Sequence, residues 1–450
     1  MYKQKSLLKI LTATISLIIT FFVWQQGLKD SLNRPSVAFD ISQKEIEITE
    51  LAMPAIPNNL RKIIANSPKE DMRNSLSQFS YDELNERSKL IWIILNGKDN
   101  NLDKSYFNGF EKTNYKNSAE SLYKSYLDES YKPAAEIING LKNDKYLFKL
   151  FTEKFNLNKE KTKTNKFAKL MLLKLIIIRT IPIFSILVGS ILALIGIWKT
   201  FIAKTIHWSK YQPLNLNQLD MILLISGGFV VIGEIISPLI SITLIDLFSG
   251  NLSFEISQSI KIFLGYLFMA IPPLYILYRQ IRFINNGFSL KIDYFQFNYK
   301  PLRESVIQGI RGWIIIIPFV LLVSLLMNLL IENQAGSNPL LEIVLNNNNY
   351  LAFIILFFTT TIIAPLFEEI IFRGVLLPIL SRDFGEIIGI IISSFVFALA
   401  HLSFTEFPPL FVLGIGLATT RLISGRLFSS VVMHSLWNGL TFLNLFLLRT

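Results

Sequence analysis

Residues 351–380 read LAFIILFFTTTIIAPLFEEIIFRGVLLPIL, an apolar run that is interrupted by Glu368, Glu369 and Arg373. A helix of about 20 apolar residues is long enough to cross the hydrocarbon core of a bilayer. Each ionisable group in such a segment costs about 2.5 to 3.5 kcal/mol, even on the lenient insertion scales. We therefore interpret these charged residues as members of a buried polar site.

The composition of the whole chain is typical of a polytopic membrane protein. Of the 450 residues, 51% are hydrophobic and 17% are charged, and the apolar residues come in long uninterrupted runs. The net charge of +11 comes from Lys and Arg in the loops between these runs, where the positive-inside rule places them, so we expect no nucleic-acid partner. Because the chain has no cysteine, disulfide bonds, thiolate nucleophiles and cysteine-ligated metals are excluded.

The apolar runs predict an all-α fold, a membrane helical bundle with about nine spans and a water-exposed helical region near the amino terminus. The first span is interpreted as an uncleaved signal anchor, because no small-residue cleavage site follows it. The other spans are predicted near residues 175–197, 221–247, 259–278, 312–331, 350–380, 386–402, 409–423 and 428–447. The expected regions are the anchor at 1–26, the water-exposed region at 27–165, accessory transmembrane helices at 166–335 and a core at 336–450.

The distribution of basic residues predicts the orientation of the chain. The loops at residues 249–257 and 332–349 contain no Lys or Arg, whereas the alternate loops are basic. This pattern places the amino terminus in the cytoplasm and residues 27–165 outside it, although the lysines at 159–169 favour the opposite side. The abundance of Asn, Lys and Ile is typical of an AT-rich bacterial genome, which favours a bacterial plasma or internal membrane.

Polar residues recur at helical spacing in the last third of the chain. They form the patterns Glu368-Glu369-x-x-x-Arg373, Phe397-x-x-x-His401 and His434-x-x-x-Asn438. A spacing of four residues puts both members of a pair on one helix face, so three helices can aim them at one point. Two further charges, Arg179 and Glu234, lie in other predicted spans; we expect them to pair across helices, with a role in a substrate gate as the alternative.

This ordered set of motifs resembles that of the CPBP intramembrane proteases, the group that includes the type II CAAX prenyl endopeptidases and the bacteriocin-processing "abortive infection" proteins. The resemblance covers residues 350–447, so the partner of residues 27–165 stays unknown. It implies an integral membrane endopeptidase that acts on membrane-associated peptide or protein substrates. The site residues that it implies are Glu368, Glu369, Arg373, His401, His434 and Asn438.

The chemistry of peptide hydrolysis suggests a role for each of these residues. The reaction needs an activated water, a proton donor for the leaving amine and hydrogen-bond donors for the oxyanion. Glu368 and His401 suit the first two tasks, and His434 with Asn438 suits the third. We expect Glu369 and Arg373 to form an ion pair that holds the first carboxylate in place. Phe397 is expected to form a wall of the cavity.

Two alternatives stay open at this stage. Glu368, His401 and His434 match the ligand count of a catalytic zinc site, so a metalloprotease that uses a divalent metal such as Zn²⁺ is the rival mechanism, although no H-E-x-x-H motif occurs. A non-catalytic membrane scaffold, for example an immunity or assembly factor that retains the fold, is the rival function. A transporter is disfavoured because the chain shows no internal repeat.

Overall fold

The structure is a computed structural model in which two compact units are distinguished. It describes residues 2–34, 37–64, 67–97, 103–128, 130–157, 161–204, 207–209, 215–241, 252–284, 295–330, 339–346 and 349–449. One unit, here called the membrane unit, comprises residues 1–37 and 182–446, and the other, the accessory unit, comprises residues 38–181 and 447–450. Every secondary-structure element in the described ranges is a helix, which confirms the all-α prediction.

Seven helices in the described ranges are long and apolar enough to cross a membrane, and each coincides with a predicted span. They are Leu7–Ser31, Lys166–Ile197, Gln218–Ser241, Phe254–Phe283, Leu302–Leu330, Tyr350–Phe384 and Phe407–Ser424. The two other predicted spans are helical as well: α18 (Glu386–Leu399) has 14 residues and α20 (Leu427–Leu447) has 21. The polytopic bundle is confirmed, and the number of nine crossings stays a prediction. Residues 242–247 and 331 of the predicted spans, and residues 249–251, 332–338 and 347–348 of the loops used for orientation, lie outside the described ranges.

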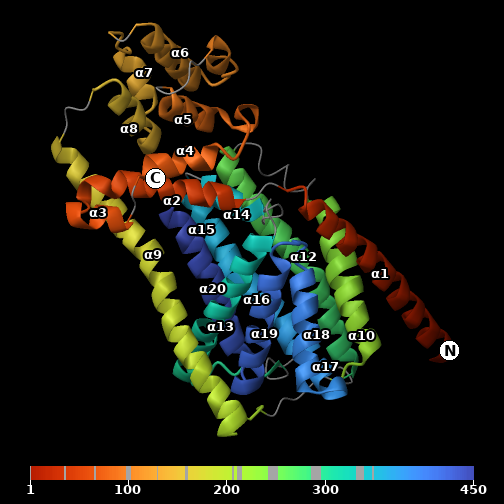
Figure 1. The fold of residues 1–450 in the computed structure, drawn as a ribbon. Helices are drawn as coiled ribbons and strands as arrows, with labels where there is room; N and C mark the ends of the chain where they lie inside the picture. Colours follow the sequence, from red (N-terminus) through yellow and green to blue (C-terminus); the bar gives the residue numbers. More distant parts are fainter. Residues whose placement is uncertain are drawn as a thin grey trace. The chain divides into compact units, whose positions relative to one another are not determined.

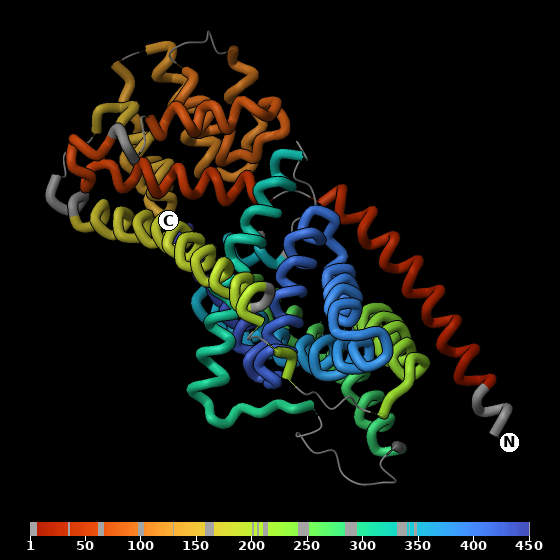
Figure 2. Tube along the Cα trace, turned by 60° about the horizontal axis from the view of Figure 1, so that its bottom comes forward, coloured from red at the N-terminus to blue at the C-terminus, as the bar shows by residue number. Residues whose placement is uncertain are grey.

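The membrane unit is a bundle of helices that pack through several neighbouring pairs. The helix α1 (Tyr2–Ser31) lies against the π-helical segment η5 (Leu223–Ile236), which continues α10 (Gln218–Ile222) (Figure 1; Figure 2). Next to η5 lies α12 (Phe254–Ile284), which also contacts α15 (Tyr350–Phe358). At the carboxyl-terminal end, α19 (Phe407–Ser424) packs against both α18 and α13 (Leu302–Leu330). The remaining helices are η4 (Trp198–Ile202), α14 (Pro339–Asn346) and α9 (Lys161–Ile197), of which residues 182–197 belong to this unit and residues 161–181 to the accessory unit.

The helix that carries the glutamate pair alternates between α-helical and π-helical geometry. From α15 it passes through η7 (Thr359–Ile363), α16 (Ala364–Glu369) and η8 (Ile370–Leu376) to α17 (Leu377–Phe384). Each π-helical stretch widens the hydrogen-bond step to five residues and so changes which way the following side chains face. Because Glu368 and Glu369 end the short α-helical piece between two such stretches, their directions differ from those on a regular helix.

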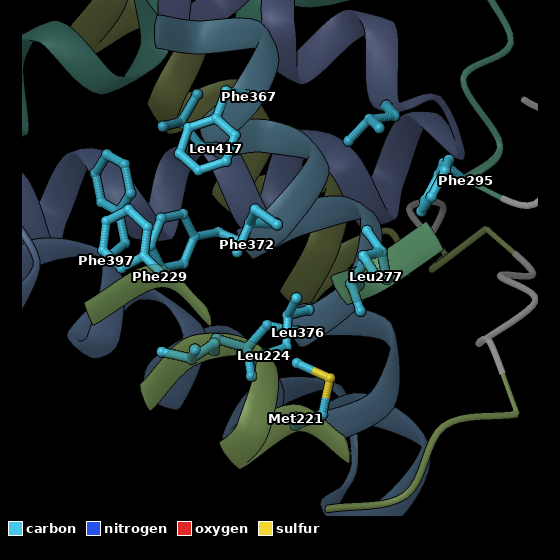
Figure 3. Packing of buried hydrophobic residues seen from close by; sticks show 14 of the residues in the cluster. Met221, Leu224, Phe229, Leu277, Phe295, Phe367, Phe372, Leu376, Phe397 and Leu417 are labelled. Atoms are coloured by element: carbon cyan, nitrogen blue, oxygen red, sulfur yellow. The ribbon is translucent and has the colours of Figure 1, made fainter. Parts of the chain in front are cut away.

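A cluster of buried rings and aliphatic side chains lies beside this helix (Figure 3). Phe372 contacts the rings of Phe229 and Phe397, with centroid distances of 6.1 and 5.4 Å. Since lipid tails are as apolar as these side chains, the close packing itself, rather than exclusion from water, holds such helices together. Small residues allow this packing: a Cβ atom at Gly414 of α19 would lie 2.9 Å from the Cβ atom of Ser394 on α18.

The accessory unit consists of short helices joined by buried ion pairs. Its helices are α2 (Val37–Ala52), α3 (Asn58–Ile64), α4 (Pro68–Leu76), α5 (Glu86–Asn96), α6 (Thr113–Leu127), α7 (Ala135–Gly140) and α8 (Lys145–Lys154), with short 3₁₀ turns at Met53–Ala55, Tyr81–Glu83 and Lys104–Phe107. Arg87 lies between Glu47 and Asp144 and so ties α5 to α2 and to the start of α8. Burial alone would raise the pKa of Asp144, but the guanidinium of Arg87 outweighs this and lowers it.

The expected pairing of Arg179 with Glu234 is wrong. The Nε atom of Arg179 lies 2.9 Å from Oε1 of Glu45, and both residues belong to the accessory unit. Glu234 belongs to the membrane unit and accepts a hydrogen bond from the indole of Trp24. The hydropathy pattern located both charges in spans but carried no information on which spans are neighbours.

Candidate active site

The centre of the candidate site is Glu369, whose carboxylate is fully buried and accepts three hydrogen bonds. Arg373 Nη1 donates to Oε1 at 2.8 Å, and His434 Nδ1 lies 2.9 Å from the same oxygen. Ser430 Oγ donates to Oε2 at 2.6 Å. The predicted ion pair between Glu369 and Arg373 is therefore confirmed, with both side chains 0% exposed. A buried charge of this kind is stable only because it is paired and hydrogen-bonded.

Arg373 connects three helices of the bundle around this carboxylate. Its guanidinium lies over the ring of Phe397 on α18, 4.1 Å from the centroid, a distance at which a cation and an aromatic face attract each other. A second donor, Nη2, reaches the carbonyl oxygen of Gly414 on α19 at 3.3 Å. Arg373 thus fixes the glutamate helix against α18 and α19.

The two histidine rings each use Nδ1 for a structural hydrogen bond. A carboxylate paired with Arg373 only accepts, so His434 Nδ1 donates to Glu369. The Nδ1 atom of His401, in the turn after α18, lies 2.8 Å from the carbonyl oxygen of Phe397 and donates to it for the same reason. In a neutral ring Nε2 then carries a lone pair. The Nε2 atom of His434 is 3.8 Å from Glu368 Oε2.

Glu368 has one satisfied and one unsatisfied oxygen. Tyr266, on α12, donates its hydroxyl to Oε1 at 2.8 Å. The other oxygen, Oε2, is buried and accepts no hydrogen bond from the described residues. An unpaired buried carboxylate oxygen is costly, and such atoms are typical of sites that bind water or a reactant.

A cavity of about 580 Å³ opens beside Glu368. Glu368, His401 and Asn438 line it together with Tyr266 and Trp437. A cavity of this size holds a short stretch of peptide, since ligand pockets usually measure about 300 to 1,000 Å³. Three of the predicted site residues therefore share one cavity.

The other predicted residues lie behind the cavity surface. Glu369, Arg373 and His434 are buried and are not among the residues that line the cavity. Phe397 is also fully buried, and its ring makes edge contacts with His401 and His434 at centroid distances of 4.8 and 5.7 Å. Phe397 therefore supports the two histidine rings and does not form the expected cavity wall.

Asn438 is oriented by a backbone carbonyl of the glutamate helix. Its Nδ2 atom donates to the carbonyl oxygen of Thr360 in η7 at 2.9 Å. Because an amide nitrogen carries two hydrogens, one donor remains for a group in the cavity. The role of Asn438 as a donor to an oxyanion stays a prediction.

Two contacts of the site were not predicted. Ser430 lies four residues before His434 on α20. This spacing puts both side chains on one helix face, so the sequence contained a signal for Ser430. Tyr266 lies on α12, 102 positions before Glu368. No local spacing links two residues so far apart, and only the folded arrangement shows their contact.

The structure does not bring the three proposed metal ligands together in a metal-binding arrangement. Across the part of the chain that the structure describes, no group of three or more His, Asp and Glu side chains is arranged so that it could hold a metal ion. Glu368, His401 and His434 do not form such a group, so we derive no catalytic step through a metal.

Two separate segments of the chain each match a protein family. Residues 350–440, which contain all three motifs, match the family of the Rce1-like type II CAAX prenyl endopeptidases. Residues 38–173 match a domain of unknown function, DUF8675, and nearly coincide with the first segment of the accessory unit. Neither the curated proteins nor the solved structures include a match to the chain.

Proposed function

We propose, from the match of residues 350–440 to the Rce1-like type II CAAX prenyl endopeptidases, that the protein hydrolyses membrane-associated peptides with a water molecule activated by Glu368. The protein is an integral membrane protein with several apolar spanning helices. One observation carries the proposal: the unsatisfied oxygen of Glu368 is buried beside a cavity that His401 and Asn438 also line. Glu368, His401 and Asn438 therefore share one space, which supports the roles of base, proton relay and oxyanion donor that we propose for them.

The proposed reaction begins with a water molecule in the cavity. The carboxylate of Glu368 takes one proton of this water while the water oxygen attacks the carbonyl carbon of the scissile bond. The carbonyl oxygen becomes an oxyanion, which the remaining hydrogen of the Asn438 amide stabilises. Glu368 then gives this proton to the amide nitrogen, either directly or through Nε2 of His401, which first accepts it; the C–N bond breaks, and the products are a new carboxyl group and a new amine.

The buried residues behind the cavity have supporting roles in this proposal. Glu369 fixes the Nδ1–H tautomer of His434, whose Nε2 faces Glu368 at 3.8 Å. Because a neutral Nε2 has no hydrogen to donate, we leave the oxyanion to Asn438 and assign His434, through its Nδ1 atom, to the buried network that holds Glu369. Arg373 balances the charge of Glu369, so Glu368 remains the carboxylate that is available for proton transfer.

The direct test uses the purified full-length chain in proteoliposomes. Membrane proteins and lipidated peptides are added as substrates, and new amino termini are identified by mass spectrometry. We expect new termini that appear with time and that are missing when the protein is omitted. If the wild-type protein produces no new termini from any of these substrates, the chain acts as a scaffold and the proposal is wrong.

We expect a Tyr266→Phe variant to lower kcat by about ten- to a hundredfold with little change in KM. The variant removes one hydrogen bond to a carboxylate, a contact of about 1.5 to 3 kcal/mol that orients the catalytic group, and it keeps the aromatic ring that lines the cavity. The measurement is steady-state hydrolysis in proteoliposomes. Tyr275→Phe, which changes an exposed ring on the same helix, is the matched control. An unchanged kcat in Tyr266→Phe would remove Tyr266 from the positioning of Glu368.

We expect hydrolysis to persist when divalent metals are removed. The described residues provide no group of three metal-binding side chains, and Glu368 with His401 supplies the proton transfers. The measurement combines metal analysis of the purified protein with activity before and after dialysis against a chelator. One equivalent of zinc that leaves together with the activity, and restores it on return, would establish the metalloprotease alternative.

A further inference from the structure

A second carboxylate enters the cavity from outside the family domain. Glu234, on η5, lines the cavity together with Glu368. The position of η5 is set by a close approach to α12, since a Cβ atom at Gly233 would lie 2.9 Å from the carbonyl oxygen of Met269. Met269 lines the same cavity. The packing of these two helices therefore holds Glu234 at the cavity.

The amino-terminal helix holds this carboxylate and also the loop that follows His401. Trp24 Nε1 on α1 donates to Glu234 Oε2 at 3.4 Å. Two turns later, Ser31 Oγ accepts a hydrogen bond from the backbone nitrogen of Phe404 at 3.0 Å, and Gly27 lies against Leu402. The same helix thus contacts the residues that place Glu234 and His401 around one space.

The charges around the cavity contrast with those of the whole chain. The chain carries a net charge of +11, but the described residues that line the cavity include three glutamates and neither Lys nor Arg. These glutamates are Glu234, Glu368 and Glu406. A low-dielectric cavity lined by one sign of charge concentrates ligands of the opposite sign.

Glu234 has little compensation inside the protein. Within the described residues it forms no ion pair, and its carboxylate accepts one long hydrogen bond from a neutral indole. One neutral donor does not offset the transfer of a carboxylate out of water. A cation that enters the cavity would offset this cost, because an ammonium or a guanidinium group forms charge-assisted hydrogen bonds with a carboxylate.

We propose that Glu234 selects substrates that place a cationic group, either a basic side chain or a free amino terminus, in the cavity on the side of η5. The proposal rests on the function inferred above, because it assigns the substrate class of the same cavity. Glu368 would act on the scissile bond while Glu234 binds the cation. Glu234 lies on η5, outside residues 350–440, so the preference for a cation would be a property of this chain and not of the matched domain alone.

The test measures binding separately from cleavage. The full-length Glu368→Ala protein, which lacks the proposed base, is titrated in detergent with short apolar peptides. One peptide has lysine and an acetylated amino terminus, one has norleucine with the same cap, and one has norleucine with a free amino terminus. We expect one of the two cationic peptides to bind about ten- to a hundredfold more tightly than the capped norleucine peptide, and that peptide identifies the source of the cation.

Changing Glu234 in the same background decides the proposal. Glu234→Gln should bring the affinity ratio close to one, and Glu234→Asp should keep a preference because the charge remains. Glu255→Gln, a carboxylate on α12 that does not line the cavity, is the control and should leave the ratio unchanged. A cationic preference that survives Glu234→Gln, or no preference in the parent protein, overturns the proposal. Cleavage by the wild-type chain is scored separately, so a lost preference and a lack of protease activity give different results.

Discussion

A Glu368→Gln variant is expected to hydrolyse peptides about a hundredfold to ten-thousandfold more slowly than the wild type, because its amide cannot accept a proton from water. Glutamine has nearly the same shape as glutamate, and its amide oxygen can still accept the hydrogen bond from Tyr266. The loss would therefore come from the missing base. Initial rates in proteoliposomes, normalised to the amount of folded protein, provide the measurement.

A matched substitution separates this loss from a general effect of removing a carboxylate. Glu386 begins α18 and does not line the cavity, so Glu386→Gln should hydrolyse at the wild-type rate. If Glu368→Gln keeps more than about a tenth of the wild-type rate, Glu368 is not the general base.

The second large effect concerns stability. Arg373→Met should lower the free energy of unfolding by about 3 to 5 kcal/mol, because it leaves the carboxylate of Glu369 buried without its cation. The loss of the contacts with Phe397 and Gly414 acts in the same direction. Reversible unfolding in mixed micelles, followed by tryptophan fluorescence, measures the change.

Two further variants identify the ion pair as the cause. The double variant Arg373→Met with Glu369→Leu removes both charges and should regain part of the lost stability, since a buried pair is often replaceable by apolar side chains. Arg303→Met, which changes an exposed arginine in the first turn of α13, should stay within about 0.5 kcal/mol of the wild type. A loss below about 1 kcal/mol in Arg373→Met would show that the buried pair does not stabilise the fold.

Features that depend on neighbours in the sequence were predictable. The apolar runs located the helices of the bundle, because a span needs a fixed length of apolar chain, although the helices that begin at Lys166 and Leu302 start about ten residues before the predicted spans. The ion pair between Glu369 and Arg373 was predictable from their spacing, since residues four apart lie on the same face of a helix. The motif order also led to the family that residues 350–440 match.

Contacts between distant helices were not predictable from one sequence. Arg179 was assigned to Glu234 because both charges lie in apolar segments, but their partners are Glu45 and Trp24. The hydroxyl of Tyr266 meets Glu368 only because α12 packs beside the glutamate helix. Apolar periodicity shows that a helix is buried, but many neighbours satisfy an apolar face equally well.

The irregular geometry of the glutamate helix was also absent from the sequence prediction. A single continuous span was expected at residues 350–380, and two π-helical stretches interrupt it on either side of α16. Pro365, near the start of α16, provides no backbone donor, which is one local reason for irregular hydrogen bonding here. The ion pair between Glu369 and Arg373, four residues apart, forms across the junction of α16 and η8 in spite of this irregularity.

The central claim is that the chain cleaves membrane-associated peptides with Glu368 as the base. The most direct measurement compares the amino termini of all membrane proteins in cells that produce either the wild type or Glu368→Gln at equal levels. We expect a defined set of new termini in the wild type, with the uncleaved precursors accumulating in the variant. Identical sets of termini in the two membranes would contradict the claim.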